Sequence, residues 1–187
     1  MSSSLGNDML ITLFVIILLL YVFTDHNTKI FGKEVWPIKK EERLQKLIVL
    51  NPYDKYKDRS VFDPYSITHI SHGILLYYIT NYINPKKDKN NLYLSLLIEI
   101  TWEVLENTEY LIKLYRKYDK YSKNYIGDSI VNILTDIFLM IFGFLFASNY
   151  KRAYLFVIIS EIILYMKIKD NLTKSIKDII IIPLVMN

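Results

Sequence analysis

Polar side chains recur inside apolar stretches of this sequence, at spacings that could bring them together for chemistry. His69 and His72 are three residues apart, while Glu99, Glu103 and Glu106 follow spacings of four and three. Side chains three or four residues apart share one face of an α-helix. We therefore expect helices that each present a row of polar side chains. A third row, with spacings of four, consists of Asp128, Asn132 and Asp136.

Converging rows of this kind need compensation for their charge. A charged side chain in the middle of a membrane costs about 2.5–3.5 kcal/mol on insertion scales. Protons, the two histidines or a divalent cation could neutralise the carboxylates, and carboxylate and amide oxygens suit Ca²⁺, Mg²⁺ or Mn²⁺. A histidine beside such a site can act as a general base or nucleophile. The alternative for all these side chains is a structural role in helix association.

The elements that must position these rows are predicted as membrane-spanning helices. The chain is 52% hydrophobic and 22% charged, and the two kinds of residue are separated into apolar runs and lysine-rich connectors. This separation is typical of an all-α, polytopic transmembrane helix bundle. We expect a single domain over residues 1–187, without disulfides because cysteine is absent. The five expected spans are Met9–Phe23, Tyr65–Ile83, Leu92–Leu111, Ser129–Ala147 and Ala153–Ile168.

The connectors predict the orientation of these spans. The two alternating sets of connectors contain 18 and 5 of the 23 Lys and Arg residues. The positive-inside rule places the richer set in the cytoplasm, and hence the N-terminus outside and the C-terminus inside. An amphipathic piece, Glu41–Leu50, predicts a short interfacial helix in the first long connector. Because the basic residues are spread over connectors, anionic lipid is a simpler partner than nucleic acid.

The three polar rows reach a similar depth from the cytoplasmic ends of their helices. At ~1.5 Å per residue, His72 lies about 10 Å, and Glu103 and Asp136 about 12 Å, from those ends. We therefore expect one polar layer on the cytoplasmic side of the bundle. Gly143 is expected to permit a close approach between helices.

Four polar segments are distinctive in combination: His69–Gly73, Ile98–Asn107, Gly127–Asp136 and Lys169–Thr173. Together they resemble a family of small bacterial integral membrane proteins of unknown function. The likeness extends from Asp63 to Thr173 and implies no activity.

A second likeness concerns the segment Ile100-Thr101-Trp102-Glu103-x-x-Glu106, followed by an acidic helix start and Thr135-Asp136-Ile137-Phe138-Leu139. It is similar to the core of eukaryotic base-exchange phosphatidylserine synthases, although this chain is shorter and its histidines are spaced differently from Glu103. Those enzymes exchange a phospholipid headgroup for serine, using calcium, a histidine and acidic residues in membrane helices. The resemblance implies that Glu103, Glu106, Asp128 and Asp136 bind a metal or neighbour its ligands and that His72 is the acid/base or nucleophile, although either His69 or His72 could be the corresponding histidine. To these we add further candidates: His69 for catalysis, Asn132 for metal binding, and Asn107, Lys169 and Asn171 for substrate contact.

The predicted function is accordingly a membrane-embedded, metal-dependent phosphatidyltransferase that exchanges phospholipid headgroups. Its partners would be a phospholipid, serine or a small amino alcohol, and a divalent cation, with Ca²⁺ the first choice and Mn²⁺ or Mg²⁺ the others. One alternative is a cation- or proton-coupled transporter or channel that uses the same carboxylates. Another is a structural membrane protein whose polar residues only join helices. The headgroup, the metal and the oligomeric state stay open.

Overall fold

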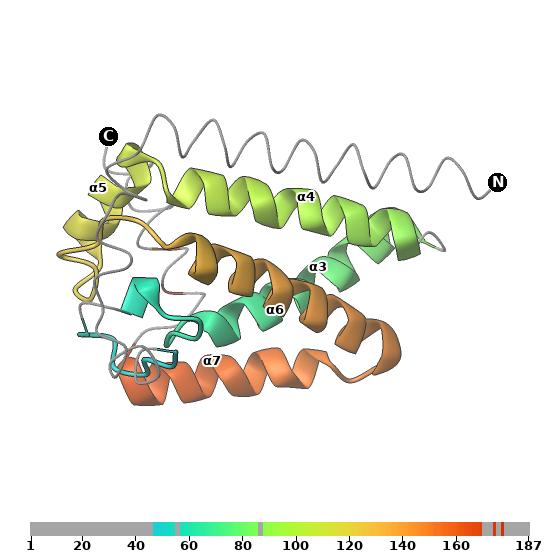
Figure 1. Ribbon diagram of the computed structural model, residues 1–187. Coiled ribbons are helices and arrows are strands. Elements are labelled where there is room, and N and C mark those ends of the chain that lie inside the picture. The colour runs from blue at the N-terminus through green and yellow to red at the C-terminus, as the bar shows by residue number, and fades with distance from the viewer. Residues whose placement is uncertain (1–46, 55–56, 86–87, 170–173, 175–176, 178–187) are drawn as a thin grey trace. The chain divides into compact units, whose positions relative to one another are not determined.

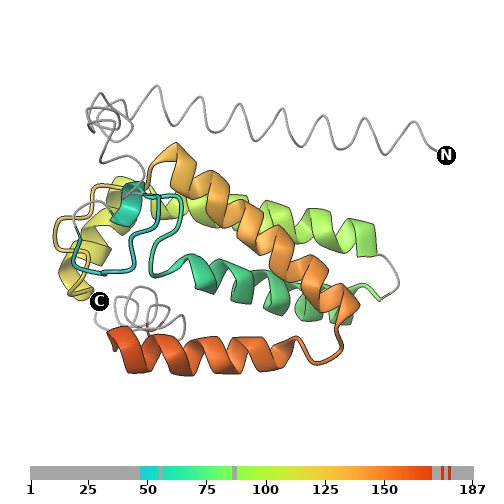
Figure 2. The same ribbon diagram turned by 60° about the horizontal axis from the view of Figure 1, so that its bottom comes forward.

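The computed structural model describes residues 47–54, 57–85, 88–169, 174 and 177, all within the unit Ile38–Asn187 (Figures 1 and 2). The expected span Met9–Phe23, most of the expected interfacial helix Glu41–Leu50, and the candidate substrate residue Asn171 lie outside the described residues. The single domain over residues 1–187 stays a prediction.

The described part of the chain is all-α, which confirms the predicted class. Three helices match the expected spans to within two residues because their apolar runs end at clear polar boundaries. The elements are η1 (Lys57–Arg59), α3 (Ser66–Ile83), α4 (Asp88–Glu106), α5 (Glu109–Tyr118), α6 (Ile130–Asn149) and α7 (Tyr154–Ile168).

The prediction of one helix over Leu92–Leu111 is wrong at its carboxyl end, because α4 ends at Glu106 and a separate helix, α5, begins at Glu109. Thr108 adopts an extended conformation and its hydroxyl accepts a hydrogen bond from the Leu111 N–H at 3.4 Å, so it caps the separate helix α5. Glu103 therefore lies about 4.5 Å from the end of α4, at ~1.5 Å per residue, rather than the expected 12 Å.

The described end of the expected interfacial helix is also not helical. Ile48 and Phe62 form a parallel bridge. The Val49 N–H donates to the Phe62 carbonyl and the Phe62 N–H donates to the Leu47 carbonyl, both at 2.9 Å. Over residues 47–50, pairing with a distant segment thus replaces the helix that the amphipathic pattern predicted.

Helices α3 and α6 cross with their backbones in close contact. A Cβ atom on Gly73 would lie 1.9 Å from the backbone oxygen of Met140, and one on Gly143 would lie 2.1 Å from the backbone oxygen of Ile70. Only glycine fits at either position, as expected for helices that associate through small residues. The prediction for Gly143 is confirmed, and the crossing fixes how the polar rows of α3 and α6 face each other.

Helix α3 is central and contacts α4, α6 and α7. Figures 1 and 2 show α4 on one side of the α3 and α6 pair and α7 on the other. The Ser71 and Ser160 hydroxyls, 2.9 Å apart, join α3 to α7. The start of α3, the end of α4 and the start of α6 meet at one end of the bundle, where η1 and α5 also lie (Figure 1).

Among the described residues, one helical segment is long and apolar enough to cross a membrane. It is Val131–Asn149, with a mean hydropathy of 2.0. By length and composition, α6 is therefore able to cross a membrane.

Candidate metal centre

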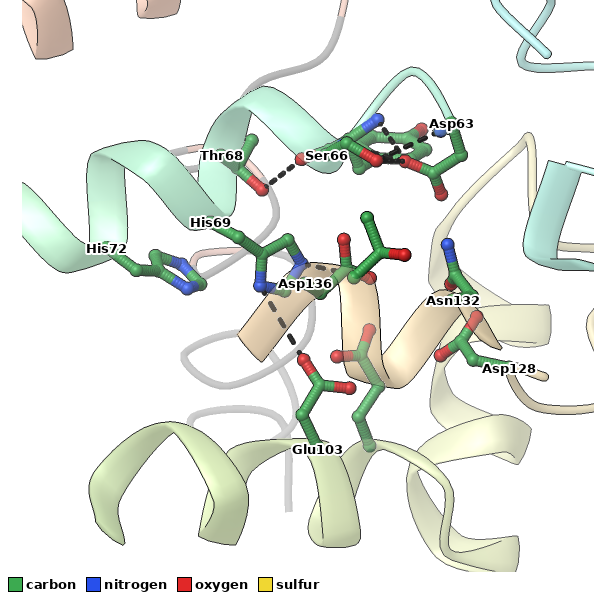
Figure 3. A network of polar contacts seen from close by, with 12 residues as sticks. Asp63, Ser66, Thr68, His69, His72, Glu103, Asp128, Asn132 and Asp136 are labelled. Carbon is green, nitrogen blue, oxygen red and sulfur yellow. Dashed lines mark hydrogen bonds and ion pairs between the residues drawn. The ribbon is translucent and has the colours of Figure 1, made fainter. Parts of the chain in front are cut away.

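His69 lies at the centre of the polar cluster and contacts acidic side chains from two other helices (Figure 3). Its Nδ1 atom is 2.6 Å from Glu99 Oε1 and 3.6 Å from Glu103 Oε1, both on α4. Its Nε2 atom is 3.7 Å from Asp136 Oδ2 on α6. One imidazole thus connects the three helices that the sequence predicted to converge.

Glu99 holds both histidines in place. Its second oxygen, Oε2, is 3.3 Å from Nδ1 of His72, and the two imidazole rings meet edge to face with centroids 5.1 Å apart. Glu99 itself is 2% exposed. A carboxylate on one ring nitrogen is the usual way in which proteins orient a histidine toward a metal, because it fixes the tautomer and leaves the other nitrogen available. Nε2 of His69, which faces Asp136, is that other nitrogen.

Two carboxylate oxygens in this cluster are buried and accept no hydrogen bond. They are Oε1 of Glu103 and Oδ1 of Asp136, in residues that are 3% and 5% exposed. A buried charged acceptor without a partner is costly, so such atoms are uncommon unless an ion or water satisfies them. Both residues belong, with His69, to a set whose potential ligand atoms, one from each residue, lie within 4.8 Å of one another.

A second set of potential ligands adjoins the first and consists of Glu103, Glu106 and Asp128, again within 4.8 Å. The Tyr115 hydroxyl donates to Glu106 at 2.6 Å, and the Tyr125 hydroxyl donates to Asp128. Each tyrosine engages one carboxylate oxygen and so orients the group. The other oxygen of each carboxylate remains for a ligand.

Asn107 and Gly127 position Asp128. The Asn107 side chain accepts a hydrogen bond from the Asp128 N–H at 2.6 Å and donates to the Glu103 carbonyl at 2.9 Å. Gly127 has a φ of 102°, which side-chain-bearing residues rarely adopt, so the chain can turn sharply into Asp128. Asn107 therefore fixes the end of α4 against the start of α6, and the substrate contact that the sequence predicted for it stays a prediction.

Charge accumulates around Asp128. Burial, together with the negative charges of Glu106 and Asp58, raises the pKa of Asp128 well above its usual range. The nearby Lys57 ammonium is 4% exposed and lies 2.8 Å from Asp58. Burial lowers the pKa of Lys57, but Asp58 outweighs it and the pKa is raised overall, so this lysine stays charged and paired.

The remaining candidates lie apart from the two ligand sets. The Asn132 amide is buried and donates to the Ser60 carbonyl at 3.2 Å, so it joins α6 to the loop after η1 rather than to the carboxylates. Lys169 is exposed, caps the end of α7 in a left-handed conformation, and places its ammonium 5.6 Å from the Tyr165 ring centroid. The predicted roles of Asn132 in metal binding and of Lys169 in substrate binding stay predictions.

Glu99 is the residue that sequence reasoning undervalued. Its spacing of four from Glu103 placed it on the polar face, but no ligand or positioning role was assigned to it. The contributions of Lys57, Tyr115 and Tyr125 had no signal in the sequence, because these residues lie outside the predicted spans and reach the cluster only through the tertiary fold.

The two ligand sets fit divalent cations. Donors on one ion, each about 2.0–2.3 Å from it, lie no more than about 4.6 Å apart. The separations within each set are close to this limit, so small side-chain shifts suffice. Carboxylates with an imidazole suit a transition ion such as Mn²⁺, whereas carboxylates alone suit Ca²⁺, Mg²⁺ or Mn²⁺.

Fold and site together define a helical protein with potential metal ligands buried between facing helices. The chain belongs to the family described as protein of unknown function (DUF2585), whose model matches residues 46–186. This agrees with the resemblance to a bacterial family of unknown function. The resemblance to phosphatidylserine synthases receives no support from the matches.

Bacterial relatives bear the name UPF0314 protein. The one from Brucella anthropi is 34% identical over 119 residues, the one from Sphingopyxis alaskensis 32% over 124, and one from Rhizobium etli 38% over 117. These alignments span 61–63% of this chain and 60–64% of the relatives, so the chain covers less than two thirds of their length. No solved structure matches the chain significantly.

Proposed function

We propose that this protein is a multi-pass membrane enzyme that uses a divalent cation to exchange or cleave the headgroup of a phospholipid. The observation behind the proposal is the pair of buried, unpartnered oxygens of Glu103 and Asp136 beside His69. A cation bound there would satisfy both oxygens and offer a charge to a lipid phosphate.

The distribution of side chains supports a multi-pass arrangement. Among the described residues, nineteen polar or charged residues are buried against twelve hydrophobic ones. Large hydrophobic side chains are exposed instead, for example Ile79 on α3, Leu97 on α4, Phe138 on α6 and Ile159 on α7. Exposed apolar faces around a polar interior are typical of helices packed in lipid, where the surrounding solvent is apolar.

The charge of the connectors supports a cytoplasmic site. The connectors before α3 and before α6 belong to the lysine-rich set, and their described residues lie at the end of the bundle that holds the cluster. The positive-inside rule then assigns this end to the cytoplasm, with the N-terminus outside and the C-terminus inside. A site at that level would be close to phospholipid headgroups.

The proposed reaction is a displacement at the lipid phosphorus. The hydroxyl oxygen of serine or an amino alcohol forms a bond to phosphorus, and the bond from phosphorus to the old headgroup oxygen breaks. His72 accepts the proton of the incoming hydroxyl and returns it to the departing alcohol. Glu99 orients His72 for this role, and the 18% exposure of the His72 side chain leaves it accessible. A divalent cation held by His69, Glu103 and Asp136 would polarise the phosphate.

The test is headgroup exchange by purified protein in phospholipid vesicles supplied with Mn²⁺ or Ca²⁺ and labelled serine, ethanolamine or choline. Wild-type protein should incorporate label or release headgroup, and His72→Ala and Glu103→Gln should reduce this at least about 100-fold, since general acid-base catalysis contributes about 10²–10⁴-fold. Glu109→Gln changes an exposed glutamate and should stay active. Equal turnover in all four proteins would overturn the proposal.

A cation transporter is the second candidate, because the acidic residues form a row along the bundle. Potential ligand sets that share residues lead from Asp128 and Glu106 through Glu103 to Asp136. Carboxylates in such a series can pass a cation or proton from one to the next. Liposome flux of Mn²⁺ or protons that depends on Glu103, without lipid turnover, would select this function.

A further inference from the structure

We propose that the centre binds two divalent cations and that the carboxylate of Glu103 bridges them. One ion would be bound by His69, Glu103 and Asp136, and the other by Glu103, Glu106 and Asp128. This inference rests on the proposed function, since it concerns the same site, and it defines how many ions the site uses.

Glu103 is the residue common to both ligand sets. Figure 3 shows it between His69 on one side and Asp128 on the other. A carboxylate has two oxygens and can bind one ion with each. Oε1 of Glu103 is buried without a hydrogen bond and lies 3.6 Å from Nδ1 of His69, so it is not already committed to another donor. Its position therefore suits a bridge.

The carboxylates of the second ion position are oriented by hydrogen bonds, as metal ligands in proteins usually are. Tyr115 and Tyr125 each donate a hydroxyl hydrogen bond to one of its outer ligands, Glu106 and Asp128. Asn107 fixes the backbone of Asp128 against the end of α4. Hydrogen bonds that orient ligating carboxylates in this way set metal affinity.

Charge balance favours two ions over one. The two sets together contain four carboxylates: Glu103, Glu106, Asp128 and Asp136. When ionised, they would match the charge of two divalent cations, whereas one ion would leave two negative charges to be neutralised by protons or by a histidine. The nearest buried lysine, Lys57, is paired with Asp58 at 2.8 Å. Uncompensated buried charge is costly, so the four carboxylates favour the second ion.

Two ions would also suit the proposed reaction. Metal pairs about 3.5–4 Å apart stabilise the attacking and the leaving oxygen of an in-line displacement at phosphorus. The bridge at Glu103 would hold such a pair at a short separation, with His72 on the side of the His69 ion.

The experiment is a titration of the metal-free full-length protein in detergent with Mn²⁺, read by calorimetry and by electron paramagnetic resonance. Wild-type protein should bind two Mn²⁺ per chain and show the spectrum of a spin-coupled pair. Asp128→Asn and Glu106→Gln should each bind one Mn²⁺ with an uncoupled spectrum. Glu109→Gln, on the exposed surface, should keep two coupled ions.

The outcomes separate the inference from the proposed function. One uncoupled Mn²⁺ in the wild type, unchanged in Asp128→Asn, would overturn the two-ion centre and leave a one-ion enzyme possible. No Mn²⁺ binding at all would overturn both. The wild-type spectrum decides the question even where a variant fails to fold, and Glu106→Gln provides a second variant beside Asp128→Asn.

Discussion

The two histidines contact the same glutamate but face different groups. His69 directs Nε2 toward Asp136, whereas His72 contacts Glu99 and lies farther along α3 (Figure 3). In the sequence, the depth of His72 agreed with those of Glu103 and Asp136, but which of the two histidines is the key one stayed open. In the structure, His69 is the one placed between those two carboxylates, which suits it for binding a cation and leaves His72 for proton transfer.

Separate substitutions should divide these roles. Loss of a hydrogen-bond partner of a metal ligand typically costs about 10–100-fold in affinity. His69→Ala removes a proposed ligand itself, so we predict that it lowers Mn²⁺ affinity by more than this range. His72→Ala should retain most of the affinity while it loses lipid turnover. Competition for Mn²⁺ with a fluorescent chelator measures the first effect and headgroup exchange the second. Similar losses of affinity in both variants would contradict the division, and each variant is the matched control for the other.

Glu99 should affect metal binding without being a ligand in either proposed set. Glu99→Gln preserves the size of the side chain but removes the charge that orients both imidazoles. We predict a fall in Mn²⁺ affinity of about 10–100-fold, with two ions still bound at saturation. The same chelator competition measures it, with Glu109→Gln as the control for loss of a glutamate charge. Unchanged affinity would show that Glu99 does not position His69.

At the scale of the elements, the crossing of α3 and α6 sets the geometry of the cluster. Gly73 lies about one turn beyond His69 on α3, and Gly143 lies about two turns beyond Asp136 on α6. A change in the crossing would therefore also move these proposed ligands. Alanine at either glycine would force the helix backbones apart, since each added Cβ would overlap a carbonyl oxygen.

We therefore predict that Gly73→Ala and Gly143→Ala each destabilise the protein by at least about 1–3 kcal/mol, the usual cost of overpacking. Thermal unfolding in detergent should show a lower midpoint for both, together with weaker Mn²⁺ binding. Ser148→Ala, at an exposed position of α6, should leave both properties unchanged. Glycine variants with wild-type midpoints would mean that the helices do not approach this closely.

The bounds of a helix were predictable from the sequence where an apolar run had clear polar ends. They were not predictable where the fold breaks an apolar run into two helices. The bounds of α3, α6 and α7 agree with the predicted spans to within two residues. The break between α4 and α5 left a local signal, since Thr108 and Glu109 are a typical cap and first-turn acid. That signal was outweighed by apolar residues continuing to Leu111. The contact that completes the break, between Asn107 and Asp128, comes from tertiary structure alone.

At the scale of the whole molecule, the sequence predicted which faces converge but not their register. Helical spacing placed Glu103 and Asp136 on inward faces, and they do lie in one ligand set with a histidine. Which histidine meets them depends on the rotation of α3 against α4 and α6. That rotation follows from the glycine contact and from the loop around η1, where the Asp58 carbonyl accepts a hydrogen bond from the Ser129 N–H at 2.9 Å. Neither contact is visible in a periodic pattern.

The proposed topology places the two ends of the helix bundle on opposite sides of a membrane. Lys120, after α5, and Lys151, between α6 and α7, are both exposed. Their connectors belong to the lysine-rich and the lysine-poor set, respectively. The positive-inside rule therefore assigns Lys120 to the cytoplasm and Lys151 to the outside.

Single cysteines can test this cleanly because the chain contains none. In intact cells, a membrane-impermeant maleimide should label Lys151→Cys and leave Lys120→Cys unlabelled until the membrane is opened by detergent. Inverted membrane vesicles should give the reverse pattern, which serves as the internal control for reactivity. Labelling of both positions from the same side would contradict a spanning α6, because that helix alone separates the two connectors along the chain. In that case the carboxylates of the proposed metal centre would not lie within a membrane, and the cost of burying charge in lipid would not apply to them.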